Sequence, residues 1–180
     1  MTEKELIQQC ILENRNSQEE LFRRYAGKML VVCIRYTRHR QEAEDVLQDA
    51  FIKVYRNLEK YEFKGSFEGW IRRIVINTAL KKHTKKSYKN ELYGVEHVPE
   101  AGQNPKVEGV LNAEYLLALV QELPSGYRTV FNLYAIEGYS HKEIADLLKI
   151  GESTSRSQLA KARGILQKKV ALLYDDKLTN

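Results

Sequence analysis

Apolar residues recur every three or four positions along most of this chain, and nowhere do they alternate convincingly as in a β-strand. This spacing places the apolar side chains on one face of an α-helix. Most of the stability of such a helix comes from packing that face against other helices. The sequence therefore predicts an all-α fold.

One stretch lacks the helical spacing and divides the chain. Residues 91–105 hold two of the three prolines and two glycines, which interrupt helices. We expect two small helical domains, at residues 1–90 and 108–180, joined by a flexible linker at residues 91–107. Each domain has room for only a small core, so a partner that adds buried surface is plausible.

Three capping boxes are predicted where a hydroxyl residue precedes a glutamate by three positions. The hydroxyl residues are Thr2, Ser17 and Ser140. In a capping box the hydroxyl accepts a backbone N–H of the first turn, and the glutamate accepts the N–H of the capping residue. Each of the three pairs therefore predicts the start of a helix.

The segment 138–167 has the spacing of a helix-turn-helix, with a short helix from Ser140 to Leu148 and a second from about Ser153. The turn holds Lys149 where glycine is usual, and Gly151 comes two residues later, so we expect either that the turn is tightened differently or that Lys149 adopts a left-handed conformation at modest cost. The second helix of such a motif enters the DNA major groove. On spacing alone, a helical hairpin with a solvated polar face is the alternative. The candidate DNA-binding residues are His141, Lys142, Thr154, Arg156, Ser157, Gln158, Lys161 and Arg163.

Two sets of motifs in this chain resemble RNA polymerase sigma factors of the extracytoplasmic-function group. The first set resembles the second conserved region of that family and comprises residues 42–51, residues 67–74 and Asn77. The other set resembles the fourth conserved region and comprises residues 123–128, 137–145 and 158–163. The two sets occur in the family's order and lie on either side of the expected linker.

The resemblance implies an alternative, signal-responsive transcription initiation factor with no catalytic residues, no cofactor and no metal. It implies binding to core RNA polymerase, through the β′ and β subunits, and to promoter DNA. Many members of this group are held inactive by an anti-sigma factor, which is a further expected partner. The N-terminal domain is then the region 2 domain, and the C-terminal domain is the region 4 domain.

The resemblance also implies roles for single residues. Asp45, Gln48 and Asp49 project away from the expected core and would dock on the β′ clamp coiled coil. The helix-turn-helix would read the upstream (−35) element as duplex DNA. Residues implied to bind the downstream (−10) element as single-stranded DNA are Tyr61, Phe63, Lys64, Ser66, Asn77 and Lys81. A place in the small core is the alternative for Tyr61 and Phe63, and Trp70 is expected in the core.

Two other classes of protein share part of this pattern. A repressor or response regulator shares the helix-turn-helix but does not need the motifs within residues 42–51 and 67–77. A nucleic-acid hydrolase could use the carboxylates clustered at residues 42–49, yet a helix spreads them over several faces, and no histidine or metal-ligand spacing accompanies them. There is also no glycine-rich phosphate loop.

Composition agrees with a protein that acts inside the cell. The net charge of +5 permits nucleic-acid binding without demanding it. The two cysteines form no Cys-x-x-Cys pair, and the N-terminus has no apolar signal region. No apolar run approaches the length that spans a membrane. We therefore expect a cytoplasmic protein with no membrane insertion.

Overall fold

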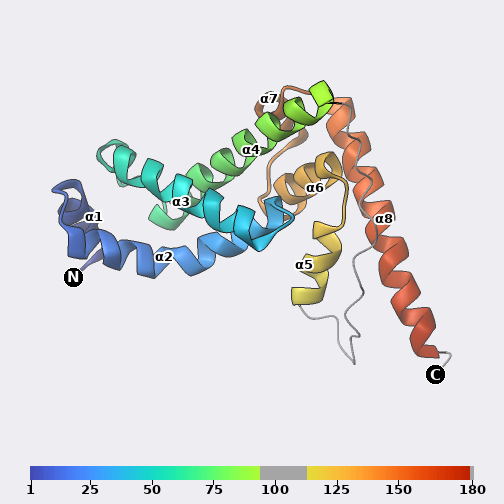
Figure 1. Ribbon diagram of the computed structural model, residues 1–180, viewed down its shortest axis with the longest axis horizontal. Helices are drawn as coiled ribbons and strands as arrows, with labels where there is room; N and C mark the ends of the chain where they lie inside the picture. Colours follow the sequence, from blue (N-terminus) through green and yellow to red (C-terminus); the bar gives the residue numbers. More distant parts are fainter. Residues whose placement is uncertain (94–112, 179–180) are drawn as a thin grey trace. The chain divides into compact units, whose positions relative to one another are not determined.

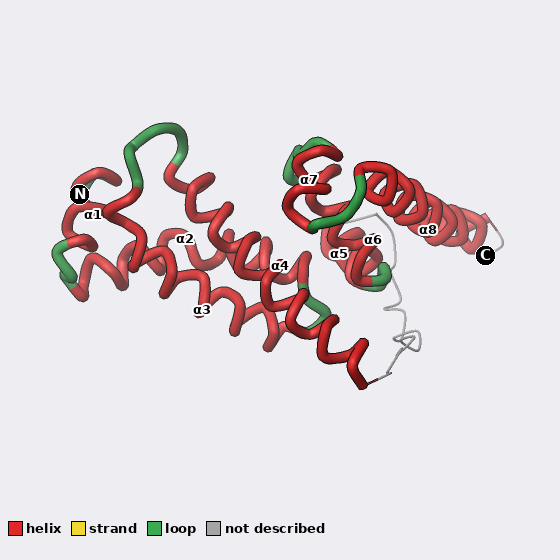
Figure 2. Tube along the Cα trace, turned by 90° about the horizontal axis from the view of Figure 1, so that it is seen from above, coloured by secondary structure: helices red, strands yellow, loops and turns green. Residues whose placement is uncertain are grey.

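The computed structural model describes residues 1–93 and 113–178, and the side chains of residues 1–82 and 114–172. Every regular element within these ranges is a helix, which confirms the all-α prediction (Figure 2). The chain divides into two compact units, Met1–Val98 and Pro99–Asn180 (Figure 1). None of the described helices combines the length and apolar character needed to cross a membrane.

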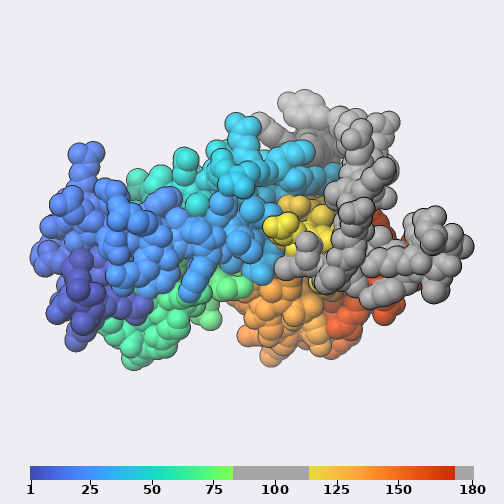
Figure 3. Space-filling view, turned by 90° about the horizontal axis from the view of Figure 1, so that it is seen from below, coloured from blue at the N-terminus to red at the C-terminus, as the bar shows by residue number. Residues whose placement is uncertain are grey.

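The N-terminal unit is a bundle around three long helices. Its elements are α1 (Glu3–Ile11), α2 (Arg15–Tyr36), α3 (Arg40–Asn57), the short 3₁₀ turn η1 (Leu58–Lys60) and α4 (Phe67–Tyr93). The helices α2, α3 and α4 pack on one another, and α1 packs on α2 (Figure 1). In Figure 3 the side chains of α1 and α2, in shades of blue, make one continuous surface. Fully buried apolar side chains from all four helices form the core, among them Leu6, Leu21, Met29, Ala50, Val54 and Ile71.

The start of α2 corrects one of the predicted capping boxes. The cap is Asn14, whose side-chain oxygen accepts the backbone N–H of Ser17 at 3.0 Å. Asparagine caps a helix as well as serine does, and here it comes first in the chain, so Ser17 lies inside the helix. Glu20 does not reach back to the backbone and instead pairs with Arg23 and Arg24. The capping box at Thr2 is confirmed.

The C-terminal end of α4 lies beyond the point that the spacing of apolar residues predicts. It continues to Tyr93, three residues into the predicted linker. The rest of that linker prediction, residues 94–107, lies outside the described residues.

The C-terminal unit packs several short helices against one long helix. Its elements are α5 (Ala113–Gln121), α6 (Ser125–Phe131), the π-helical turn η2 (Asn132–Ile136), α7 (His141–Leu148) and α8 (Glu152–Leu178). The helical pairing that begins in α6 widens at η2, where the N–H of Glu137 donates to the carbonyl of Asn132 at 3.0 Å. Buried side chains of the core include Leu119, Leu123, Val130, Leu133, Ile144, Leu159 and Ala162.

The helix-turn-helix is formed by α7 and α8. The capping box at Ser140 is confirmed, with its hydroxyl accepting the N–H of Glu143 at 3.2 Å. Lys149 ends α7 in the left-handed conformation, with φ 57° and ψ 43°, which is one of the two outcomes expected for this turn. The N–H of the next residue, Ile150, donates to the carbonyl of Ala145 at 3.1 Å. The turn is therefore closed by backbone hydrogen bonds although it lacks the usual glycine.

Candidate functional site

An acidic surface, made by Asp45, Gln48 and Asp49, lies on the side of α3 that faces away from the core. All three side chains are exposed. Lys82 of α4 reaches across to them, with its Nζ 3.4 Å from Asp49 Oδ2 and 3.8 Å from Asp45 Oδ2. The structure thus brings the three predicted residues together and adds a lysine that partly neutralises the two carboxylates.

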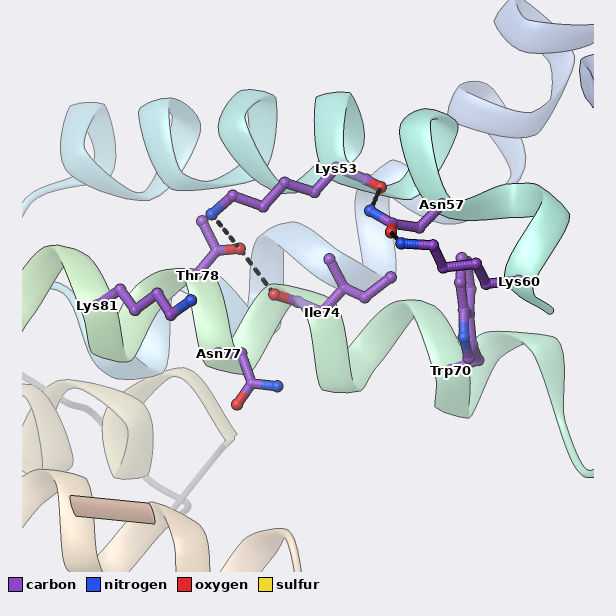
Figure 4. Close-up of a pocket in the computed structure, with 8 residues that line it drawn as sticks. All are labelled: Lys53, Asn57, Lys60, Trp70, Ile74, Asn77, Thr78 and Lys81. Atoms are coloured by element: carbon purple, nitrogen blue, oxygen red, sulfur yellow. Dashed lines mark hydrogen bonds between the residues drawn. The ribbon is translucent and has the colours of Figure 1, made fainter. Parts of the chain in front are cut away.

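A pocket of about 300 Å³ opens between α3 and α4 (Figure 4). Its lining residues are Lys53, Asn57, Lys60, Trp70, Ile74, Asn77, Thr78 and Lys81. The three lysines make the pocket electropositive, and the indole of Trp70 supplies a flat apolar wall. Asn77 and Lys81 are two of the residues that the sequence predicts to bind DNA. An aromatic face beside amide and ammonium groups is the combination that holds an unstacked nucleobase and its phosphate.

Hydrogen bonds fix the α3 side of this pocket. Lys53 Nζ donates to Thr78 Oγ1 at 3.0 Å, and the hydroxyl of Thr78 donates to the carbonyl of Ile74 at 2.8 Å. Asn57 is held at both ends of its amide, by the carbonyl of Lys53 and by the ammonium of Lys60. Among the residues drawn in Figure 4, no hydrogen bond joins Asn77 or Lys81 to the others. These two side chains are therefore the ones best placed to bind a ligand.

The loop between η1 and α4 is held by aromatic packing, and this corrects one predicted DNA contact. Tyr61 is 6% exposed, and its hydroxyl donates to the carbonyl of Gly65 at 2.9 Å. Its ring centroid lies 5.0 Å from those of Phe63 and Phe67. Tyr61 therefore closes the core, which is the alternative expected for it, and offers little surface to a ligand. Phe63 is 45% exposed and has a left-handed backbone with φ 56°, which is uncommon for an aromatic residue.

The other predicted residues of this loop are exposed but lie outside the pocket. Lys64 pairs with Glu62 at 2.6 Å, and Ser66 Oγ accepts the N–H of Gly69 at the start of α4. Trp70 was expected in the core, yet it is only half-buried and forms a wall of the pocket. The spacing of apolar residues misplaced it because a residue at the edge of the apolar stripe can face either the core or a groove.

On α8 the predicted DNA-binding residues follow two flanks of the helix and not one face. Gln158 lies beside Gly126 of α6, and Lys161 Nζ lies 5.8 Å from the ring centroid of Tyr127. Arg163 lies on the other flank, 5.7 Å from the ring of Tyr134 in η2. Helical spacing places Thr154 with the first flank and Arg156 with the second. Most of the set is exposed: Lys142, Thr154, Arg156, Ser157, Lys161 and Arg163.

His141 joins the two helices of the motif. Its Nδ1 lies 2.9 Å from the hydroxyl of Ser155, a residue with no exposed surface, and its ring stacks on Tyr134 at 4.5 Å. Packing thus occupies one nitrogen and one face of the imidazole. His141 therefore has a structural role in the motif, and its role as a DNA contact stays a prediction.

The sequence prediction missed the α3 side of the pocket. Lys53, Asn57 and Lys60 recur at intervals of four and three residues, which places them on one flank of a helix. That stripe was available in the sequence, but only the packing of α4 beside it shows that it faces a pocket. Ser155 was missed because a serine among the buried positions of an amphipathic helix gives no signal of its own.

Comparison with known proteins gives the same order of domains. Residues 21–88 match the family Sigma-70 region 2, and residues 113–166 match the family Sigma-70, region 4. The chain belongs to the extracytoplasmic-function sigma factors. It is 28% identical over 179 residues to the RNA polymerase sigma-H factor of Pseudomonas aeruginosa, with 92% of each chain covered. It is 29% identical to the ECF RNA polymerase sigma factor SigW of Bacillus subtilis, over 81% of this chain and 84% of that one.

The fold of this sigma factor is also that of a solved structure. The sigma factor RpoE of Bartonella quintana, crystallised with the anti-sigma factor NepR, superposes with a TM-score of 0.56 at 19% identity. The match covers 85% of this chain and 96% of that one. The protein is therefore a DNA-binding transcription initiation factor, not an enzyme, and its partners are core RNA polymerase and promoter DNA.

Proposed function

We propose that this sigma factor recruits core polymerase through the acidic surface of α3, binds the downstream element in the pocket between α3 and α4, and reads the upstream element with α8. The observation that carries the proposal is the pocket, which places Trp70, Asn77 and Lys81 around one cavity in the unit that matches region 2. The domain roles follow, with residues 1–90 as the region 2 domain and 108–180 as the region 4 domain.

The acidic surface has the chemistry of a polymerase contact. Two carboxylates and an amide on an exposed helix face can pair with basic side chains of the β′ subunit. Because they point away from the core, they can bind a partner without any change in the packing of α3. Sigma factors act on the polymerase in the cell interior, and we place this protein in the cytoplasm.

The pocket is suited to a base taken out of the stack. Trp70 would pack on the base, Asn77 would contact its polar edge, and Lys81 would pair with a phosphate. Phe63, Lys64 and Ser66 are exposed on the adjacent loop and would contact the neighbouring nucleotides. Tyr61 is excluded because it is buried.

On the C-terminal unit, Gln158 would read a base edge, while Lys142, Thr154, Arg156, Ser157, Lys161 and Arg163 would contact bases or phosphates. His141 would hold α7 against α8 through Ser155 and contact DNA only through the part of its ring that stays exposed. Binding to the β subunit and to an anti-sigma factor stays a prediction of the family resemblance.

The test is transcription by reconstituted holoenzyme on a library of randomised promoters, with the selected sequences read out for each variant. Asn77→Ala should relax preference in the downstream element only, and Gln158→Ala in the upstream element only, by about 1–3 kcal/mol at one position. Lys161→Ala should weaken binding to all sequences alike and lower the salt slope by roughly one unit. If Asn77→Ala selects the wild-type downstream element, the pocket does not bind it.

A further inference from the structure

Lys82 contacts the acidic surface and directly follows Lys81, which lines the pocket. Asp45, Asp49, Lys53 and Asn57 follow one another at intervals of four residues along the flank of α3 that faces α4. Lys82 bridges Asp45 and Asp49, while Thr78, four residues earlier on α4, bonds Lys53 in the pocket. These two cross-links between α3 and α4 are about 6 Å apart along each helix.

The neighbouring residue, Lys81, points to the other surface. Lys81 lines the pocket, whereas Lys82 contacts the carboxylates. A strand with a base in the pocket would carry its backbone phosphates past this end of α4. Lys82 is 44% exposed, so its ammonium is within reach of solvent and of such a phosphate without any movement of the helix.

We propose that Lys82 changes its ion-pair partner when polymerase and DNA bind this domain. The proposal rests on the function proposed above for Asp45 and Asp49. In the free protein its ammonium pairs with the two carboxylates and competes with the basic side chains of the polymerase. When basic side chains of the polymerase pair with the two carboxylates, Lys82 is released. It then pairs with a phosphate of the single strand held in the pocket. Binding of polymerase therefore strengthens binding of DNA, and the coupling is reciprocal.

The physical basis is the cost of leaving like charges close together. Asp45 and Asp49 lie one helical turn apart, so their carboxylates repel each other unless a cation lies between them. Within the described part of the chain, only the ammonium of Lys82 lies near both carboxylates, and a phosphate that bound it would compete with them for its charge. Because all three side chains are partly exposed, this ion pair is weak. Removing the charge of Lys82 should therefore tighten binding to core polymerase by about two- to fivefold.

The test compares the full-length protein with Lys82→Gln, and with Lys81→Gln as the matched control that removes the same charge one residue away. Binding to purified core polymerase is measured by fluorescence anisotropy of a C-terminally labelled chain at one fixed salt concentration. Lys82→Gln should bind core about two- to fivefold more tightly, and Lys81→Gln should bind it as wild type does.

The second measurement is the affinity of each holoenzyme for single-stranded DNA at several salt concentrations. The DNA is the non-template strand of a promoter selected by the wild-type holoenzyme. Lys82→Gln should lower the slope by about 0.7, the value for one phosphate contact on a single strand. The exchange is overturned if Lys82→Gln binds core no more tightly than wild type, if Lys81→Gln tightens core binding equally, or if the slope for Lys82→Gln does not change.

One further variant separates this inference from the proposed function. If Asp49→Arg binds core as wild type does, the acidic surface is not the polymerase contact, and the proposed function fails there. If Asp49→Arg weakens core binding while Lys82→Gln leaves it unchanged, the polymerase contact stands and only the exchange fails.

Discussion

Replacing Lys149 by glycine should stabilise the C-terminal unit. Lys149 ends α7 with φ 57° and ψ 43°, a left-handed conformation that brings the Cβ of a non-glycine residue close to the following carbonyl oxygen. That strain costs about 1–2 kcal/mol, and glycine avoids it. Glycine also loses about 0.5–1 kcal/mol more conformational entropy on folding. Since Lys149 is exposed and has no packing to lose, the net gain is about 0.5–1 kcal/mol.

The single tryptophan makes this prediction easy to assign to one unit. Trp70 lies in Met1–Val98, so its fluorescence follows the N-terminal unit, whereas far-ultraviolet circular dichroism follows the helices of both. For a unit of this size, the gain corresponds to a rise of about 2–8 °C in the melting temperature. The rise should be seen in the circular dichroism of the C-terminal unit. The tryptophan transition should not move.

Lys149→Ala is the control, because it removes the same charge but keeps the Cβ and therefore the strain. It should be no more stable than wild type. If Lys149→Gly and Lys149→Ala melt together, the left-handed turn stores no strain, and the reasoning from its backbone conformation is refuted.

Three further predictions follow from single features of the structure. Asp49→Arg should weaken binding to core polymerase by on the order of tenfold, measured by anisotropy, while the melting temperature stays unchanged because Asp49 is exposed. Ser155→Ala removes the buried hydroxyl beside His141 Nδ1 and should lower the stability of the C-terminal unit by about 1 kcal/mol in urea titrations, whereas the exposed Ser157→Ala should not. Burial raises the pKa of Cys10 to about 11 and the pKa values of Cys33 and Tyr55 to about 12. The unfolded chain then releases protons that the folded chain keeps, so this contribution to stability is full below about pH 8.5, where free thiols begin to ionise, and is lost as the pH rises toward 11–12. A urea midpoint that stays constant from neutral pH to about pH 10.5 would contradict this, and so would rapid reaction of the folded protein with a thiol reagent at neutral pH.

The linear pattern of residues determined the helices and most of their core-facing sides. Leu6, Leu21, Cys33, Val46 and Ile144 are buried as their spacing predicts, because periodicity along one helix is a property of consecutive residues. The capping box at Ser140 and the left-handed Lys149 were equally predictable, since each depends on residues only a few positions apart. The sequence motifs were also sufficient to place the chain among the sigma factors.

Tertiary packing decided what the side chains of the site contact. Tyr61 and Trp70 are both aromatic residues near the same loop, yet Tyr61 is buried against Phe67 and closes the core, whereas Trp70 lines the pocket between α3 and α4. Lys81 and Lys82 are adjacent and chemically identical, but Lys81 lines the pocket whereas Lys82 contacts the carboxylates. Lys82 meets Asp49, 33 positions earlier in the chain, only because α3 and α4 pack side by side, and a pattern among neighbouring residues does not predict such a contact.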